Sequence, residues 1–137
     1  MADSYEYNFK SVLFLTLFVE ANMRLRRFKI MDISKKDWKL FRERLSGWQE
    51  NYMEGLVKEY ANFLNDDKKP ASEKFWELEK RIKEDKRHLG VIMEMSKSEV
   101  IWDIVRLIRL KVITYDDLSD FSDELQNEVK RILEMSR

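Results

Sequence analysis

The feature that most constrains this chain is its scarcity of turn-forming residues. Its 137 residues include one proline, Pro70, and three glycines, Gly47, Gly55 and Gly90. Average usage would give roughly ten glycines and seven prolines at this length, and these residues form most tight turns and strand ends. Apolar residues recur at spacings of three and four along nearly the whole chain, which is the period of a helix. The sequence therefore predicts an all-α protein.

Capping signals and apolar periodicity divide the chain into helices joined by short connections. The expected helices cover residues 5–30, 34–64, 71–88, 97–112 and 120–135, with a short helical turn at 114–118. No internal repeat and no linker of domain size separates them. We therefore expect one helical domain over residues 1–137, a roughly antiparallel bundle of five to six helices with a C-terminal helical cap.

The longest expected helix covers about residues 34–64. Ser34 is a good N-cap residue, and Asp37 follows three positions later to make an approximate capping box. An apolar stripe continues on one face from Trp38 to Phe63, which favours a single helix of roughly 45 Å. Gly47 marks the position where this helix is kinked or broken if it is not continuous.

The later helices have cap signals of their own. Pro70 suits the first turn of the helix over residues 71–88, and Gly90 is expected to cap its end. The residues expected to point inward from this helix are Phe75, Trp76, Leu78 or Glu79, Ile82 and Leu89. A capping box is expected at Ser96 with Glu99, and Thr114 and Asp117 are expected to cap a short turn that ends at Leu118.

Most catalytic chemistry is excluded by residue type. The chain has no cysteine and a single histidine, His88. Disulfides, iron–sulfur clusters and cysteine-ligated zinc are therefore excluded, and Ser-His nucleophilic systems would all require His88. Three scattered glycines cannot form a phosphate-binding loop. We expect no catalytic residues, no cofactor and no metal site, and so a protein that is not an enzyme.

Paired carboxylates are the one catalytic alternative that the sequence leaves open. Glu73 and Glu77 lie one helical turn apart, as do Glu99 and Asp103. Two such pairs facing across a bundle could hold Mg²⁺ and a pyrophosphate. That arrangement would resemble the all-helical nucleoside-triphosphate pyrophosphohydrolases, whose carboxylates follow a tighter and more acidic pattern. The alternative function is therefore a magnesium-dependent nucleotide hydrolase.

Charge is balanced overall, with 26 basic and 26 acidic residues, but it is segregated along the chain. Residues 24–44 contain nine basic and three acidic side chains, whereas residues 116–128 contain six acidic and no basic ones. The basic candidates for an interaction surface are Arg24, Arg26, Arg27, Lys35, Lys36 and Lys39. They could bind nucleic acid, but a neutral protein gains little long-range attraction to phosphate. We favour mutual neutralisation of the two segments.

The last helix does not have the residues of a DNA reader. Its first turns carry Asp120, Asp123 and Glu124, which phosphates would repel. An acidic helix is better suited to a basic partner protein. Trp76 and Trp102 have polar neighbours, so partial exposure at an interface is expected for both.

One apolar segment, Ser11–Val19, is a candidate for a targeting or membrane segment. It is nine residues long, about half of what a membrane span requires, and no basic n-region precedes it. We therefore expect a cytoplasmic protein that does not insert into a membrane.

Elimination leaves binding as the expected function. The sequence predicts a small non-enzymatic protein-interaction module, such as an immunity, antitoxin or inhibitor-type accessory protein. The partner is another protein or a second copy, in which case the long helix over residues 34–64 would form the shared seam of a homodimer. Nucleic acid is the less favoured partner.

Overall fold

The structure is a computed structural model that describes residues 30–135. The chain divides into two units, Met1–Met31 and Asp32–Arg137, and the account below concerns the second. The predicted helix over residues 5–30 lies outside the described residues except for Ile30, which is not helical. Arg24, Arg26, Arg27 and the apolar segment Ser11–Val19 also lie outside them. Whether residues 1–137 form one domain stays a prediction.

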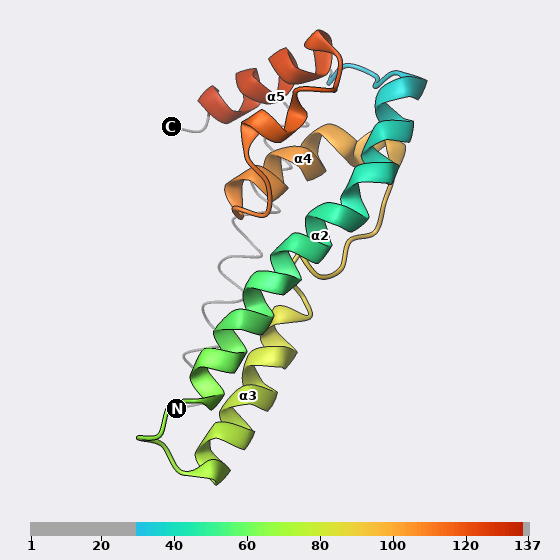
Figure 1. Cartoon of the computed structure of the whole chain (residues 1–137). Helices are drawn as coiled ribbons and strands as arrows, with labels where there is room; N and C mark the ends of the chain where they lie inside the picture. Colours follow the sequence, from blue (N-terminus) through green and yellow to red (C-terminus); the bar gives the residue numbers. More distant parts are fainter. Residues whose placement is uncertain (1–29, 136–137) are drawn as a thin grey trace. The chain divides into compact units, whose positions relative to one another are not determined.

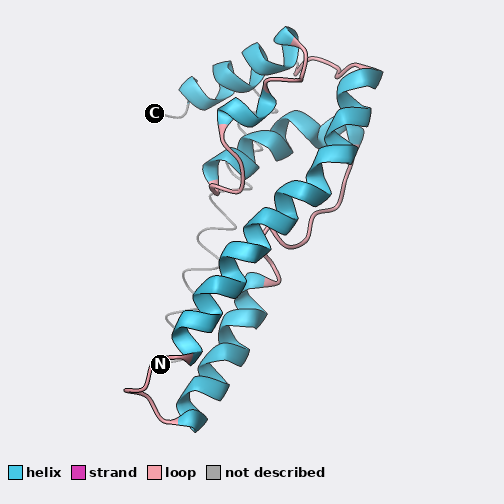
Figure 2. Cartoon of the chain, viewed as in Figure 1, coloured by secondary structure: helices cyan, strands magenta, loops and turns pink. Residues whose placement is uncertain are grey.

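The described residues are helical and contain no strand (Figures 1 and 2). Their α-helices are α2 (Lys35–Leu64), α3 (Ala71–Asp85), α4 (Val100–Arg109) and α5 (Asp123–Met135), and their 3₁₀ helices are η1 (Lys97–Glu99) and η2 (Tyr115–Leu118). The all-α prediction is confirmed. The predicted count of five to six bundled helices is not, because four α-helices and two short 3₁₀ helices are seen over residues 30–135.

Helix α2 is a single helix of 30 residues that passes through Gly47 and Gly55 without interruption. Its N-cap is Ser34, as predicted, and the Ser34 hydroxyl accepts a hydrogen bond of 3.0 Å from the Asp37 amide. The helix is long enough to take part in two separate packing regions. Its first half contacts Phe121 and Ser122, just before α5, through Trp48 and Asp37, and α3 runs back along its second half (Figure 1).

The buried core lies at the first of these regions. Its members are Ile33, Phe41, Leu45 and Trp48 near or on α2, Val100, Ile101, Ile104, Val105 and Leu107 on α4, Ile113, Leu118 and Phe121 between α4 and α5, and Leu125, Val129 and Ile132 on α5. Aromatic contacts join these elements: the ring centroids of Trp48 and Phe121 are 6.2 Å apart. The apolar stripes predicted for α4 and α5 therefore form a true core.

A buried carboxylate connects the starts of α2 and α5. Asp37 is 1% exposed, and its oxygens accept hydrogen bonds from the Ser122 amide (3.0 Å) and hydroxyl (2.5 Å). The Ser122 hydroxyl in turn accepts a 3.2 Å bond from the Leu125 amide in the first turn of α5. The Asp37 carboxylate thus accepts hydrogen bonds at the start of α5 instead of completing the predicted capping box at Ser34.

Two predicted caps are wrong. Helix α3 ends at Asp85, and Gly90 has no left-handed backbone conformation that would cap it. Gly90 is instead required by close packing, because a Cβ atom there would lie 2.2 Å from the Tyr52 ring. Ser96 and Glu99 form no capping box, since the Ser96 hydroxyl lies 3.0 Å from that of Ser98.

The ends of α4 and η2 are capped differently. Helix α4 stops at Arg109, before the predicted limit of residue 112, because Lys111 turns left-handed with φ 60°. The Val112 amide then donates 2.9 Å to the Leu107 carbonyl, which closes the helix end. The predicted cap of Thr114 and Asp117 is confirmed and is a capping box, in which the Asp117 carboxylate accepts a 2.7 Å bond from the Thr114 amide.

Candidate functional site

The α2–α3 hairpin is packed through polar side chains. The Lys74 ammonium group donates 2.9 Å to the Leu64 carbonyl, and the Tyr60 hydroxyl donates to the Asp85 carboxylate. The Arg81 guanidinium lies 4.3 Å from the ring centre of Phe63. Helix α3 buries none of its 15 residues. Contact between the two helices therefore depends on hydrogen bonds and a cation–π contact, with little apolar burial.

Aromatic stacking closes the base of the hairpin. The rings of Tyr52 and His88 are stacked with centroids 4.5 Å apart, and the Gly90 amide donates 3.0 Å to His88 Nδ1. Burial lowers the pKa of His88, although the charge of Asp85 acts in the opposite direction. Burial, and then the hydrogen bond to Asp85, raises the pKa of Tyr60 to about 12.

The apolar residues of α3 face solvent, contrary to the prediction that they point inward. Phe75 and Trp76 are each 64% exposed and Ile82 is 37% exposed, whereas Leu78 and Leu89 are half-buried. The Phe75 and Trp76 rings meet edge to face, 5.1 Å apart. The helical spacing of the apolar residues correctly indicated which of them share a face of α3. That face does not pack against α2.

Helix α2 adds to the same surface. Val57 is 61% exposed and Leu64 is 41% exposed, two turns apart. On each helix, some residues face the other helix and form the line of contact. When two right-handed helices are antiparallel, residues that follow this line by about a quarter turn, in the direction of increasing residue number, lie on the same side of the pair for both helices. Val57 and Leu64 on α2, and Phe75 and Ile82 on α3, are displaced in this way. We call these four residues and Trp76 the hairpin face.

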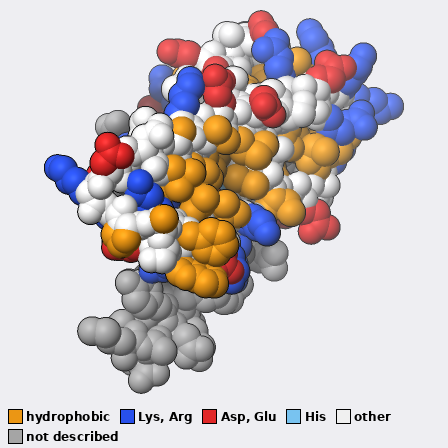
Figure 3. Space-filling model, turned by 60° about the horizontal axis from the view of Figure 1, so that its bottom comes forward, with side chains coloured by type: hydrophobic (Ala, Val, Ile, Leu, Met, Phe, Trp, Pro, Cys, Tyr) orange, Lys and Arg blue, Asp and Glu red, His pale blue; other side chains and the backbone are white. Residues whose placement is uncertain are grey.

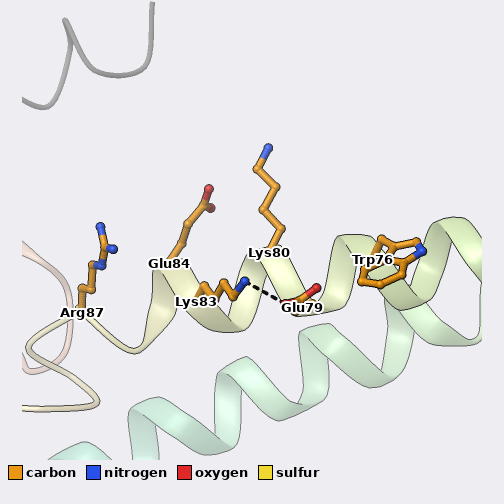
Figure 4. A pocket seen from close by; sticks show the side chains of 6 residues that line it. All are labelled: Trp76, Glu79, Lys80, Lys83, Glu84 and Arg87. Atoms are coloured by element: carbon orange, nitrogen blue, oxygen red, sulfur yellow. Dashed lines mark ion pairs between the residues drawn. The ribbon is translucent and has the colours of Figure 1, made fainter. Parts of the chain in front are cut away.

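Figure 3 presents the end of the molecule that carries the α2–α3 turn, and hydrophobic side chains gather there into a continuous patch with charged groups around it. Charged residues of α3 also form a shallow hollow of about 280 Å³ next to Trp76 (Figure 4). Its lining residues are Trp76, Glu79, Lys80, Lys83, Glu84 and Arg87. Glu79 and Lys83 form an ion pair of 2.7 Å. The hairpin face therefore combines exposed aromatics with a charged rim.

The basic and acidic segments predicted from the sequence meet at the opposite end of α2. Lys35, Lys36 and Lys39 are exposed in its first turns, and Asp123 and Glu124 are exposed in the first turn of α5. Lys39 lies 3.9 Å from Glu43. Arg44 forms an ion pair with Asp120, which neutralises part of the basic segment internally, as favoured from the sequence. Trp102, on α4, is half-buried.

The paired carboxylates are engaged by basic neighbours. Glu77 lies 3.3 Å from Arg81, and Glu73 lies 3.7 Å from Lys69. Glu99 and Asp103 each lie 3.9 Å from Arg106. Over the described range, no three His, Asp or Glu side chains are grouped so that they could hold a metal ion. The hypothesis of a magnesium-dependent hydrolase gains no support from this arrangement.

The burial of one of these carboxyl groups was not predicted from the sequence. Asp103 is 4% exposed, and its Oδ2 atom has no hydrogen-bond partner. Burial raises the pKa of this carboxyl to about 6, although the charge of Arg106 acts in the opposite direction. Its position within the apolar run of α4, between Ile101 and Ile104, was the signal that could have identified it.

Within residues 30–135, none of the helices has both the length and the apolar character needed to cross a bilayer. In comparisons with protein-family models, curated proteins and solved structures, no match to this chain was found. The candidate site therefore depends on the geometry of the hairpin alone.

Proposed function

We propose that this chain is a non-enzymatic protein-interaction module that binds through the hairpin face. One observation carries the proposal: α3 packs against α2 through its polar side and exposes its apolar side. Exposed apolar patches rimmed by polar residues are typical of binding surfaces in proteins. Phe and Trp are among the residues enriched at protein interfaces, and Trp is enriched among those that contribute most to affinity.

The remainder of the second unit is suited to supporting such a surface. The core around α4 and α5 holds the first half of α2, and α2 continues as one helix into the hairpin. A stable helix thereby presents Val57 and Leu64 away from the core. Binding residues on regular helices are positioned more precisely than residues on loops.

The class of protein that fits best is a small accessory protein of the immunity, antitoxin or inhibitor type, acting in the cytoplasm. Such proteins act by occupying a surface on another macromolecule. The absence of cysteine and the single histidine, half-buried and stacked on Tyr52, support a binding role over a catalytic one.

Cross-linking in the source cells tests this proposal. Three forms of the full chain are compared: wild type, the hairpin-face variant Phe75→Ser/Ile82→Ser, and the control Ile92→Ser/Leu110→Ser. The control removes apolar groups of matched exposure, 64% and 42%, from elsewhere in the chain. A protein adduct found with wild type and the control, but lost with the hairpin-face variant, is the expected result. Equal adducts with all three forms would contradict the proposal.

A further inference from the structure

The charges of α3 and the turn that follows it are arranged in two halves. Residues 71–79 carry three acidic side chains and one basic side chain, for a net charge of −2. Residues 80–87 carry five basic and two acidic side chains, for a net charge of +3. Phe75 lies in the negative half and Ile82 in the positive half. Three of these charged residues, Lys74, Arg81 and Asp85, contact α2. Without them the two halves carry −3 and +3, so the charge on the remaining surface of this segment still reverses near its middle.

This layout is self-complementary in one direction only. A second α3 packed antiparallel places each negative half beside a positive half, and Phe75 then meets Ile82 of the second copy. A parallel α3 would place like charges side by side, which is unfavourable. A two-fold axis close to Leu78 and Glu79 generates the antiparallel arrangement, with the same patch used on both copies.

The exposed area is of the size that such an interface needs. A buried aromatic side chain covers about 150–250 Å², so Phe75 and Trp76 at 64% exposure together offer about 200–300 Å². Val57, Leu64 and Ile82 raise the apolar total to roughly 400–500 Å². Because about 60% of an interface is apolar, the corresponding total is about 700–800 Å² per copy, close to the standard interface size.

We propose that the hairpin face binds a second copy of this chain, with the two α3 helices antiparallel. This inference rests on the proposed function and names the partner of the same site. Two hairpins joined in this way give a four-helix arrangement that covers the apolar sides of both. The seam lies on α3, and α2 contributes Val57 and Leu64 at its edge.

Sedimentation equilibrium of the full chain is the first test. Wild type and the control Ile92→Ser/Leu110→Ser are expected to approach twice the chain mass of 16.7 kDa at micromolar concentrations. Phe75→Ser/Ile82→Ser is expected to weaken dimerisation at least 100-fold while keeping the helical circular dichroism signal. A monomeric wild type at millimolar concentration would overturn the inference, and so would equal dimerisation of all three forms.

Disulfide trapping tests the direction of packing, because the chain has no cysteine of its own. Glu79→Cys, close to the two-fold axis, is expected to cross-link to itself under oxidation. Ser72→Cys is expected not to cross-link to itself but to cross-link when mixed with Lys86→Cys. Efficient self-cross-linking of Ser72→Cys, with no cross-link between Ser72→Cys and Lys86→Cys, would show parallel packing and contradict the inference.

Failure of this inference can be told apart from failure of the proposed function. If the chain is a monomer but its cross-links to other cellular proteins require Phe75 and Ile82, a second copy is not the partner. The proposed binding role of the hairpin face is then kept. A monomer whose adducts are unaffected by Phe75→Ser/Ile82→Ser refutes both. A dimer sensitive to that variant supports both.

Discussion

The two halves of α2 belong to regions built in opposite ways. In the first half, Phe41 and Leu45 are buried, and the Trp48 ring contacts Phe121 between α4 and α5. In the second half, α2 meets α3 through Tyr60, Asp85 and other polar groups, and the large apolar side chains of α3 are exposed. The first region is a buried apolar core, whereas the second leaves its apolar side chains exposed, as a binding surface does.

This contrast indicates how the free energy of folding is distributed. Burial of apolar area is the main favourable contribution to folding, and it is concentrated in the first region. Hydrogen bonds between partly exposed polar groups contribute little net stability. The hairpin should therefore be locally less stable than the core, and its exposed residues should be replaceable without loss of the fold.

A matched pair of phenylalanines gives the largest expected difference. Phe41→Ala empties a fully buried site and should lower the free energy of unfolding by about 3–5 kcal/mol. Phe75→Ala should change it by less than about 0.5 kcal/mol, because that side chain is 64% exposed. Urea denaturation at low protein concentration measures both. Similar losses for the two variants would remove the distinction between the regions.

A matched pair of hydrogen-bonding groups gives the next effect. Asp37→Ala leaves Ser122 without its buried acceptor and should cost about 2–3 kcal/mol. Tyr60→Phe removes the hydrogen bond to Asp85 in the hairpin and should cost about 0.5–1 kcal/mol. The same denaturation measurement compares them. A larger loss for Tyr60→Phe would show that the hairpin contributes more stability than its polar contacts imply.

The buried carboxylate of the core should give a pH-dependent effect. The pKa of Asp103 is raised from 3.8 to about 6 in the folded state. The folded chain therefore binds more protons than the unfolded chain between about pH 4 and 6, and this group lowers stability as pH rises through that range. Relative to wild type, Asp103→Asn should gain about 1–3 kcal/mol between pH 4 and pH 7.5. A difference independent of pH would contradict the shift.

A matched pair of glycines gives the smallest effect. Gly90→Ala places a methyl group against the Tyr52 ring and should cost about 1–2 kcal/mol at the base of the hairpin. Gly55→Ala meets nothing within 4 Å and should stabilise α2 by about 0.5–1 kcal/mol. Thermal unfolding followed by circular dichroism detects both shifts. Destabilisation by Gly55→Ala would indicate a contact on that side of α2.

Local features of the fold could be predicted from the sequence. The Ser34 cap, the length of α2 and the cap of Thr114 and Asp117 depend on residues close together in the chain, and all three are confirmed. The prediction at Ser96 failed because a short 3₁₀ helix, Lys97–Glu99, follows it, and the Glu99 carboxylate lies near Arg106. The link between Asp37 and Ser122 joins residues 85 positions apart, and no local pattern signals it.

The candidate site could be predicted only in part. Periodicity placed Phe75 and Ile82 on one face of a helix, but it predicted that this face points inward. Trp76 was expected to point inward from its spacing and to be partly exposed from its polar neighbours, and the structure agrees with the second expectation. Polar contacts of Lys74, Arg81 and Asp85 determine which face of α3 packs against α2. The spacing of apolar residues in the sequence does not predict these contacts. The opposite charges near Arg44 and Asp120 were recognisable, and the structure pairs these two residues.

Hydrogen–deuterium exchange of the wild-type chain tests the central contrast most directly. At the lowest practical concentration, amides of residues 75–82 in α3 should exchange at least 100-fold faster than those of residues 125–132 in α5. Raising the protein concentration should slow exchange in α3 and leave α5 unchanged, as the second copy covers the hairpin face. Equal protection of α3 and α5 in the dilute chain would show that α3 belongs to the core and would contradict the account.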